Sequence, residues 1–242
     1  MTNEKGERIA KVIAASGYCS RREAESLILE GRVKVNGVTI ETPATFITDQ
    51  SIKIDDKLIN NNKQEARLWI LHKPEGVLTT SKDPNNRKTV FDILPKNMPR
   101  VITIGRLDYN TEGLLLLTTR GELARHLELP KNKIPRQYRA RVFGKLNHER
   151  LKKLIKGITI DGVRYGSIKV VVDVEKESNS WLTISLEEGK NREIRKVMEE
   201  LGLKVNRLIR TNFGPFSLGT LKVGEIHEIP RATVKKHFGE IL

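Results

Sequence analysis

The stretch Gly105-Arg106-Leu107-Asp108-Tyr109-Asn110-Thr111-Glu112-Gly113, followed by the apolar run Leu114-Leu115-Leu116-Leu117, is the most informative part of this chain. A continuous apolar run of this length, bounded by glycine and polar residues, is typical of a strand buried in a sheet. We therefore expect Asp108 to lie where a rigid strand meets a loop, because a rigid element can hold a reactive group in place. Arg106 lies two residues upstream and, in a locally extended segment, shares a face with Asp108. On this pattern alone, an ordinary polar turn before a strand is the more common explanation.

Basic residues dominate the chain after residue 59. The formal net charge is +14, whereas residues 1–59 contain nine basic and nine acidic residues, so the excess lies downstream. Residues 120–156 alone contain twelve basic residues and three acidic ones, which favours a phosphate-bearing partner. A solvated basic face without a partner is an alternative. An anionic membrane surface is a weaker one, because no long amphipathic or apolar span accompanies the charge.

Cysteine and histidine usage argues against a metal site or a cofactor. Cys19 is the only cysteine, so the chain has no internal disulfide, and a reducing compartment fits. The five histidines form no i, i+4 ligand pair, and neither a Walker loop nor a dinucleotide fingerprint is present. The polar start of the chain lacks the apolar core of a secretory signal, so we expect a cytoplasmic protein without metal or nucleotide cofactor.

The first forty residues predict two short helices and a hairpin. Residues 8–15 have apolar side chains at helical spacing, and Ser20 to Glu23 is a capping box for a second helix that ends near Glu30. Residues 32–40 alternate around Asn36-Gly37, which suits a type I′ turn. Arg21 and Arg22 begin the second helix, where positive charge opposes the helix dipole, so they are candidates to bind RNA phosphate. Ordinary surface arginines are a nearly equal alternative.

The remainder of the chain predicts an α+β unit after a polar linker near residues 60–66. We expect strands at 68–73, 76–80, 101–104, 138–144, 168–174, 181–186 and 205–211. We expect three helices. The first begins at a capping box, Thr119–Glu122, and ends before Pro130, and the second covers residues 147–156 with Leu151, Leu154 and Ile155 buried. The third has an inward-facing stripe of Ile194, Val197, Met198 and Leu201 and ends at Gly202.

Two resemblances follow from these motifs. Ser20-Arg21-Arg22-Glu23-Ala24, Gly31-Arg32-Val33 and Val35-Asn36-Gly37 resemble the small S4-type RNA-binding domain of several ribosome-associated proteins. The rest of the chain resembles the pseudouridine synthases of the RsuA/RluB branch. The matching blocks are His72-Lys73-Pro74-Glu75-Gly76, Gly105 to Asp108 with Thr111 to Leu114, Arg136-Gln137-Tyr138-Arg139-Ala140, Glu188 to Arg195, and Arg207-Leu208-Ile209-Arg210. Several blocks in the family order are far more specific than Gly-Arg-Leu-Asp alone.

The second resemblance implies an enzyme that isomerises a uridine already in RNA without a cofactor. It implies that Asp108 is the central carboxylate, acting as a nucleophile or as the acceptor of a ribose proton. It also implies that Lys190 is the cationic partner of Asp108, and that Tyr138 stacks on the uracil and helps to remove the C5 proton. Lys190 lacks the planar fork of the arginine found in many relatives.

The same resemblance gives the expected contacts with RNA. The target base must leave its stack, with Arg106 filling the vacated space and Leu208 lining the uracil pocket, although an ordinary buried leucine explains Leu208 equally well. Arg192 and Arg195 lie three apart on one predicted helix and are expected to bind phosphate. Further expected RNA-binding residues are Arg21, Arg22, Lys131, Lys133, Arg139 and Arg141.

Together these patterns predict an S4-like domain over residues 1–60, a linker over 61–67 and a catalytic domain over 68–242. The fold class is α+β, with a small helical and hairpin domain followed by a larger, mainly antiparallel sheet and flanking helices. We expect a monomer that modifies structured ribosomal RNA, closest to the large-subunit (23S) members. A small-subunit (16S) enzyme and a non-catalytic ribosome-associated RNA-binding protein are the alternatives.

Overall fold

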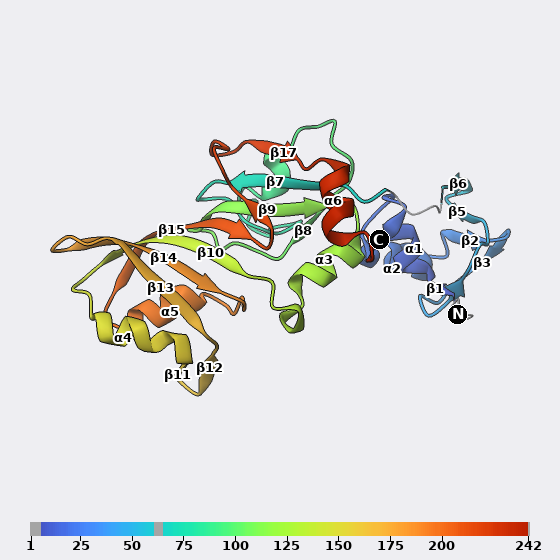
Figure 1. Cartoon of the computed structure of the whole chain (residues 1–242). Coiled ribbons are helices and arrows are strands. Elements are labelled where there is room, and N and C mark those ends of the chain that lie inside the picture. Colours follow the sequence, from blue (N-terminus) through green and yellow to red (C-terminus); the bar gives the residue numbers. More distant parts are fainter. Residues whose placement is uncertain (1–5, 61–64, 242) are drawn as a thin grey trace.

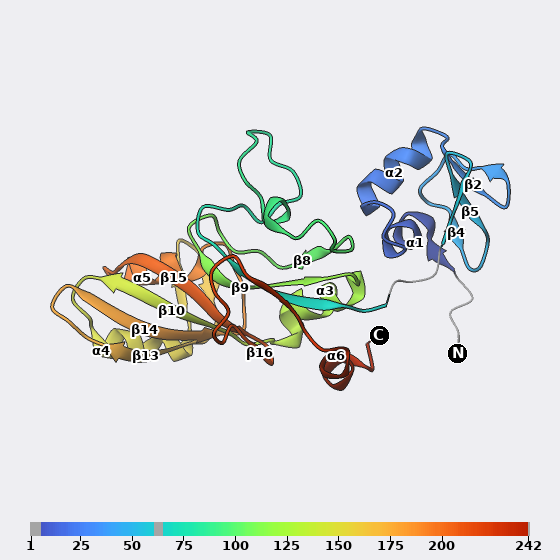
Figure 2. The same cartoon turned by 90° about the horizontal axis from the view of Figure 1, so that it is seen from above.

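The computed structural model describes residues 6–60 and 65–241, and the first of these ranges forms a small unit with its own core (Figures 1 and 2). Its elements are β1 (Glu7–Arg8), α1 (Ile9–Ala15), α2 (Arg21–Leu29), β2 (Val33–Val35), β3 (Val38–Thr39), β4 (Phe46–Ile47), β5 (Ile52–Ile54) and β6 (Lys57–Ile59). Ile9, Ile13, Ile28, Ile52 and Ile54 are completely buried in its core. The two predicted helices and the hairpin at Asn36-Gly37 are confirmed.

The predicted capping box at the start of α2 is also confirmed. The Ser20 hydroxyl accepts a hydrogen bond from the Glu23 amide at 3.1 Å, and the Glu23 carboxylate accepts one from the Ser20 amide at 2.7 Å. Two otherwise unpaired amides at the helix start are satisfied in this way. The unit contacts the rest of the chain through Lys11 and Glu122, 3.2 Å apart, and through Glu23 and Arg100, 3.9 Å apart.

The second range is built on one large sheet with the strand order β13-β14-β10-β15-β9-β7-β17, in which β8 also pairs with β9 and β16 with β15 (Figure 1). Its strands are β7 (Leu68–Lys73), β8 (Ile102–Ile104), β9 (Glu112–Thr118), β10 (Arg136–Phe143), β13 (Ile168–Val174), β14 (Asn179–Leu186), β15 (Lys204–Phe213), β16 (Phe216–Ser217) and β17 (Ile226–Glu228). Every residue of β9 is buried, as the apolar run predicts. The predicted α+β class with a mainly antiparallel sheet is confirmed.

The pairing of β9 with β15 is the seam of this sheet, because it is parallel and joins two antiparallel groups of strands. Only two residue pairs form it, Glu112 with Ile209 and Gly113 with Arg210. Gly113 has φ +110°, and a Cβ atom there would lie 2.3 Å from the Arg210 carbonyl oxygen. The close approach of the two strands therefore requires glycine at this position.

Helices cover the sheet in two places. The helices α3 (Gly121–Glu128) and α6 (Arg231–Phe238) pack with the Leu114 and Leu116 side of β9. On the opposite side, α4 (His148–Lys153), the 3-10 helix η3 (Leu154–Lys156) and α5 (Glu193–Glu200) share a core with β10, β14 and β15. The remaining elements are the 3-10 helices η1 (Val90–Ile93) and η2 (Pro130–Asn132) and the hairpin of β11 (Ile158–Ile160) and β12 (Val163–Tyr165).

Three local predictions in this range are wrong. Residues 76–80 form no strand, because Leu78 makes only an isolated bridge to Thr89. Thr119 does not cap α3, since Arg120 is the N-cap residue and the Thr119 hydroxyl donates to the Glu65 carbonyl instead. Ile155 is 52% exposed, although the helical pattern predicted it as buried with Leu151 and Leu154.

The predicted linker over 61–67 lies mostly outside the described residues, which resume at Glu65. Arg67 is held by Glu228 through two hydrogen bonds of 2.7 and 2.5 Å, so this end of the segment is part of the second unit. None of the helices within residues 6–60 and 65–241 has the length and apolar character needed to cross a bilayer.

Candidate active site

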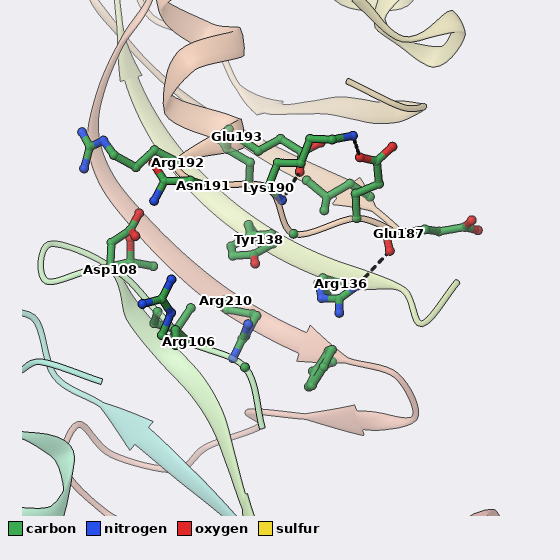
Figure 3. Close-up of a pocket in the computed structure, with 18 of the residues that line it drawn as sticks. Arg106, Asp108, Arg136, Tyr138, Glu187, Lys190, Asn191, Arg192, Glu193 and Arg210 are labelled. Carbon is green, nitrogen blue, oxygen red and sulfur yellow. Dashed lines mark hydrogen bonds and ion pairs between the residues drawn. The ribbon is translucent and has the colours of Figure 1, made fainter. Parts of the chain in front are cut away.

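An open pocket of about 960 Å³ lies at the seam of the large sheet, and it brings together most of the predicted site residues. Residues of the β8–β9 loop, of β10 and β15, and of the segment entering α5 line it (Figure 3). Among the predicted residues, the lining contains Arg106, Asp108, Lys133, Tyr138, Lys190, Arg192, Arg195 and Leu208. The pocket is wide enough for a nucleoside to enter from an RNA strand.

Asp108 and Tyr138 approach this pocket from the two strand groups that meet at the seam. Asp108 is half-buried in the loop that leads from β8 into β9. Tyr138, 9% exposed, points from β10 into the pocket, and its neighbour across the sheet is Arg210, which in turn pairs with Gly113. A carboxylate and a phenol are therefore presented to one space by elements with buried, rigid surroundings.

Lys73 fixes the main chain around Asp108. This lysine at the end of β7 is completely buried, and its Nζ donates to the carbonyl oxygens of Pro74 at 2.9 Å, Asp108 at 3.2 Å and Thr111 at 2.9 Å. Burial lowers the pKa of the Lys73 ammonium to about 8, although the nearby Asp108 carboxylate acts in the opposite direction. The loop that carries Asp108 is thus tied at two carbonyls to the end of β7.

Arg195 holds the same loop from the other side. Its guanidinium donates to the Asn110 carbonyl at 2.7 Å and to the Val205 carbonyl at 2.9 Å. Burial lowers the pKa of Arg195, and the neighbouring Arg192 cation adds to this effect. The predicted pairing of Arg192 and Arg195 as one basic helix face is wrong, because Arg192 precedes α5 in a left-handed conformation and Arg195 is occupied by backbone.

Two further buried guanidiniums, those of Arg136 and Arg210, lie against the ring of Phe213 at 4.8 and 4.9 Å. Arg136 donates to the carbonyls of Ile134, Glu187 and Leu127, and burial lowers its pKa. The Arg210 Nε donates to the Leu114 carbonyl at 2.7 Å, whereas its Nη2 has no hydrogen-bond partner among residues 6–60 and 65–241.

All four cations therefore donate hydrogen bonds to carbonyl oxygens. Such partners accept hydrogen bonds but bring no full negative charge, so they do not neutralise the cations next to the pocket. A nearby cation favours the ionised form of a carboxylate and attracts phosphate. The pocket is consequently suited to a polyanionic ligand.

Lys190 lies in the pocket but does not contact Asp108. Its ammonium forms an ion pair with Glu188, and Figure 3 shows the side chain extending away from Asp108. The ammonium also lies 5.9 Å from the centre of the Tyr165 ring. The predicted Lys190–Asp108 pair is therefore not formed in this structure. Glu193 caps this turn by accepting from the Lys190 amide at 2.9 Å, and burial raises its pKa.

The other predicted RNA-binding residues fall into three places. Arg106 and Lys133 line the pocket, where Arg106 is exposed and Lys133 ends η2 in a left-handed conformation, with Lys131 just before it. Arg21 and Arg22 are exposed at the start of α2. Arg139 and Arg141 are exposed on β10 but point to the face opposite Tyr138, so they lie outside the pocket.

The role of the buried cations was missed by the sequence-based reasoning. Lys73, Arg136 and Arg210 lie in motif blocks that the resemblance includes, but their partners are backbone atoms up to 96 positions away. Leu208, in contrast, is buried in the row of the sheet that contains Ala140 and lines the pocket as predicted.

A carboxylate and a phenol in a cationic pocket, joined to a small unit of the RNA-docking kind, define an enzyme that acts on RNA. Comparison with known families specifies the class further. Residues 67–200 match the RNA pseudouridylate synthase family and residues 7–52 match the S4 domain. The chain therefore belongs to the RNA pseudouridine synthases, which are isomerases.

Individual relatives agree with this assignment. An RNA pseudouridine synthase of Rickettsia felis is 50% identical over 95% of this chain and 100% of its own length. The ribosomal large subunit pseudouridine synthase B of Pasteurella multocida is 43% identical, and that of Yersinia pestis is 39% identical. Both matches cover 88% of this chain, and 64% and 69% of the respective relatives. A crystal structure of a pseudouridylate synthase has the same fold, with a TM-score of 0.67, 23% identity, and coverage of 95% of this chain and 98% of that one.

Proposed function

We propose that this enzyme converts one uridine of large-subunit ribosomal RNA into pseudouridine, with Asp108 as the reacting carboxylate. The single observation that carries the assignment of Asp108 is its place in the pocket. It shares that space with Tyr138, and Lys73 and Arg195 hold the main chain at Asp108 and Asn110. The relatives of Pasteurella multocida and Yersinia pestis that are named for the large subunit support the choice of RNA.

The reaction breaks the bond from ribose C1′ to uracil N1 and forms a bond from C1′ to C5, after which C5 loses a proton and N1 gains one. Asp108 acts on the ribose from which the uracil detaches, either as a nucleophile or as the acceptor of a ribose proton. Tyr138, which lines the pocket, stacks on the uracil and helps to remove the C5 proton. No cofactor is required by this balance of atoms.

The cations at the pocket, which donate to carbonyl oxygens, attract the phosphates of the RNA that surrounds Asp108. The flipped uridine enters beside Leu208, and Arg106, which is exposed at the pocket rim, occupies the gap that the base leaves in the RNA. The N-terminal unit, with Arg21 and Arg22 exposed, holds a structured stem-loop of the same RNA.

Replacing Asp108 by Asn tests this assignment, because the amide preserves the shape of the side chain and removes its negative charge. We expect pseudouridine formation to fall by at least about a thousandfold, while RNA affinity changes little. The readout is chemical mapping of pseudouridine in large-subunit and small-subunit ribosomal RNA incubated with each protein. Asp161→Asn is the matched control, since Asp161 is exposed in the β11–β12 turn with φ +48° and Asn tolerates this conformation.

This experiment tests the role of Asp108 and the choice of large-subunit RNA independently of each other. Full activity of Asp108→Asn would contradict the role of Asp108, whatever the RNA. Modification of small-subunit RNA alone by the parent protein would contradict the choice of large-subunit RNA and leave the role of Asp108 untouched.

A further inference from the structure

The sheet formed by β13, β14, β10 and β15 has two faces of opposite character. Direct partners across an antiparallel sheet share a face, so the register separates its residues into alternating rows. The rows Val170–Ile184–Tyr138–Arg210 and Val172–Leu182–Ala140–Leu208 face the core and the pocket. The rows between them face the other way.

That other face, called here the open face, carries three rows. They are Lys169–Ser185–Gln137–Asn212, then Val171–Thr183–Arg139–Ile209, then Val174–Trp181–Arg141–Arg207. Phe143, next to Lys204, extends the face at the end of β10. Val171, Val174 and Phe143 are 47%, 41% and 50% exposed, so this side of the four strands is accessible to a partner (Figure 1).

The open face combines aromatic rings with an excess of positive charge. Its basic residues are Lys169, Arg139, Arg141, Lys204 and Arg207, and the acidic groups that face them are Asp173 and Glu112. Glu112 is engaged by Arg207 at 2.5 Å, while Asp173 accepts a hydrogen bond from Thr183 and lies 4.0 Å from Arg139. Arg141 and Lys169 are exposed.

The planar groups of the open face are arranged for stacking. The guanidinium of Arg139 lies 4.7 Å from the centre of the Trp181 ring, and Trp181 itself is partly exposed. Trp181 and Arg141 are direct neighbours across the sheet, so a ring and a second cation lie side by side. A base can stack on such a pair while its phosphate meets the adjacent cation.

We propose that the open face binds a single-stranded segment of RNA, separately from the pocket on the opposite side of the same sheet. Four-stranded sheets with exposed aromatic residues are one established way in which proteins bind unpaired bases. Charge complementarity favours RNA over a second copy of this chain, because five basic side chains on one sheet face attract phosphate and repel the same face of another copy. The proposal goes beyond the isomerase activity and does not depend on Asp108.

The test uses an oligonucleotide that contains only adenylate, which offers the pocket no uridine. The chain has two tryptophans, and Trp69 is 4% exposed, so fluorescence quenching by the oligonucleotide reports mainly on Trp181. We expect quenching in the parent protein and its loss in Trp181→Phe. We expect Trp181→Ala to weaken binding about five- to a hundredfold.

Charge removal provides an independent readout. In Arg139→Ala/Arg141→Ala, the slope of log affinity against log salt concentration should fall by about 1.4 for a single strand. The matched control is Lys235→Ala/Lys236→Ala, which removes the same charge from exposed positions of α6 and should affect the slope much less. Circular dichroism and thermal unfolding establish that each variant is folded.

The two proposals are separated by Asp108→Asn, which should bind the oligoadenylate as the parent does whether or not Asp108 is catalytic. Absence of quenching overturns the proposal for the open face. An equal decrease of the salt-dependence slope in Arg139→Ala/Arg141→Ala and in Lys235→Ala/Lys236→Ala also overturns it, since this result would indicate only long-range attraction. Self-association that Trp181→Ala abolishes, without binding of the oligoadenylate, would assign the face to a second copy of the chain instead.

Discussion

The pocket wall and the N-terminal unit place their positive charges in opposite ways. In the N-terminal unit, cations pair with carboxylates at the surface, as Arg32 does with Asp55 at 2.7 Å and Lys34 with Asp56 at 2.6 Å. In the pocket wall, Lys73, Arg136, Arg195 and Arg210 are buried or half-buried and donate only to carbonyl oxygens. Their hydrogen-bond partners carry no full negative charge, so these partners do not neutralise the cations.

This difference indicates what each region can do. Surface ion pairs contribute little stability and leave little net field, whereas a cation held by backbone dipoles keeps its field in a region that excludes water. The N-terminal unit is therefore suited to docking by shape and by its exposed arginines Arg21 and Arg22. The pocket wall is suited to attracting phosphate.

Loss of the Lys73 cation should have the largest effect of the changes in the pocket wall. Lys73→Met removes the donor to three carbonyls, including that of Asp108, and we expect activity to fall by about a hundredfold or more. Steady-state modification assays measure this. The control Lys53→Met removes an exposed lysine from β5 and should leave activity within about twofold of the parent. Equal activity of the two variants would contradict the role of Lys73.

The lowered pKa of Lys73 should make the difference in stability between the parent protein and Lys73→Met depend on pH. Its folded value of about 8 lies below the ordinary 10.5, so between these values the unfolded chain binds more protons than the folded one. The stability of the parent relative to Lys73→Met should therefore rise from pH 8 to pH 10, by up to about 3 kcal/mol. Urea unfolding at several pH values measures the difference. A constant difference across this range would mean that Lys73 titrates as an exposed lysine does.

Arg195 and Arg192 should have different roles, because Arg195 positions the loop that carries Asp108 whereas Arg192 binds RNA. Arg195→Gln breaks the contacts with the Asn110 and Val205 carbonyls, and we expect kcat to fall about tenfold to a hundredfold with little change in KM. Arg192→Gln, which removes an exposed charge at the pocket, should mainly raise KM. If Arg195→Gln raised KM and left kcat unchanged, the result would instead support the phosphate-binding role that the sequence predicted for Arg195.

Removal of unpaired surface charge should have a smaller effect. We expect Lys131→Ala/Lys133→Ala to reduce the slope of log affinity against log salt by about 1.8 for a duplex RNA ligand. Lys34→Ala, in contrast, removes a charge that Asp56 already neutralises and should change the slope by much less than one unit. Filter binding at several salt concentrations measures both. Similar slopes per charge removed would contradict the distinction between paired and unpaired cations.

The smallest expected effect is a loss of stability in the N-terminal unit alone. Ser20→Ala removes the cap of α2 and should lower the free energy of unfolding by about 1 kcal/mol without affecting catalysis. Ser26→Ala is the control within the same helix, because the Ser26 hydroxyl only donates to the Arg22 carbonyl. Thermal unfolding of the two variants measures the difference. A loss of stability as large in Ser26→Ala would show that the cap is not the cause.

The features that could be predicted are those with local causes. The capping box at Ser20, the Asn36-Gly37 hairpin and the buried strand β9 depend on residues close in sequence, and all three are confirmed. The anchors of the buried cations could not be predicted, because a carbonyl oxygen is present at every residue and Arg210 meets one 96 positions away.

One signal was available and was overlooked. Tyr138 and Arg139 are neighbours on a predicted strand, so they must point to opposite faces of the sheet. The alternation along β10 thus already separates Arg139 and Arg141 from the site of Tyr138. Lys190, in contrast, was assigned to Asp108 by resemblance alone, and nothing in the sequence indicates that Glu188 competes for its charge.

The seam between β9 and β15 has a consequence for the biogenesis of the enzyme. Asp108 precedes β9 and Tyr138 lies beside β15, so the complete pocket requires contacts between segments about a hundred residues apart. The N-terminal unit closes over fewer than sixty residues and has its own core. Such short-range contacts form faster during folding than long-range strand pairing. A nascent chain therefore acquires its RNA-docking module before it acquires catalytic competence.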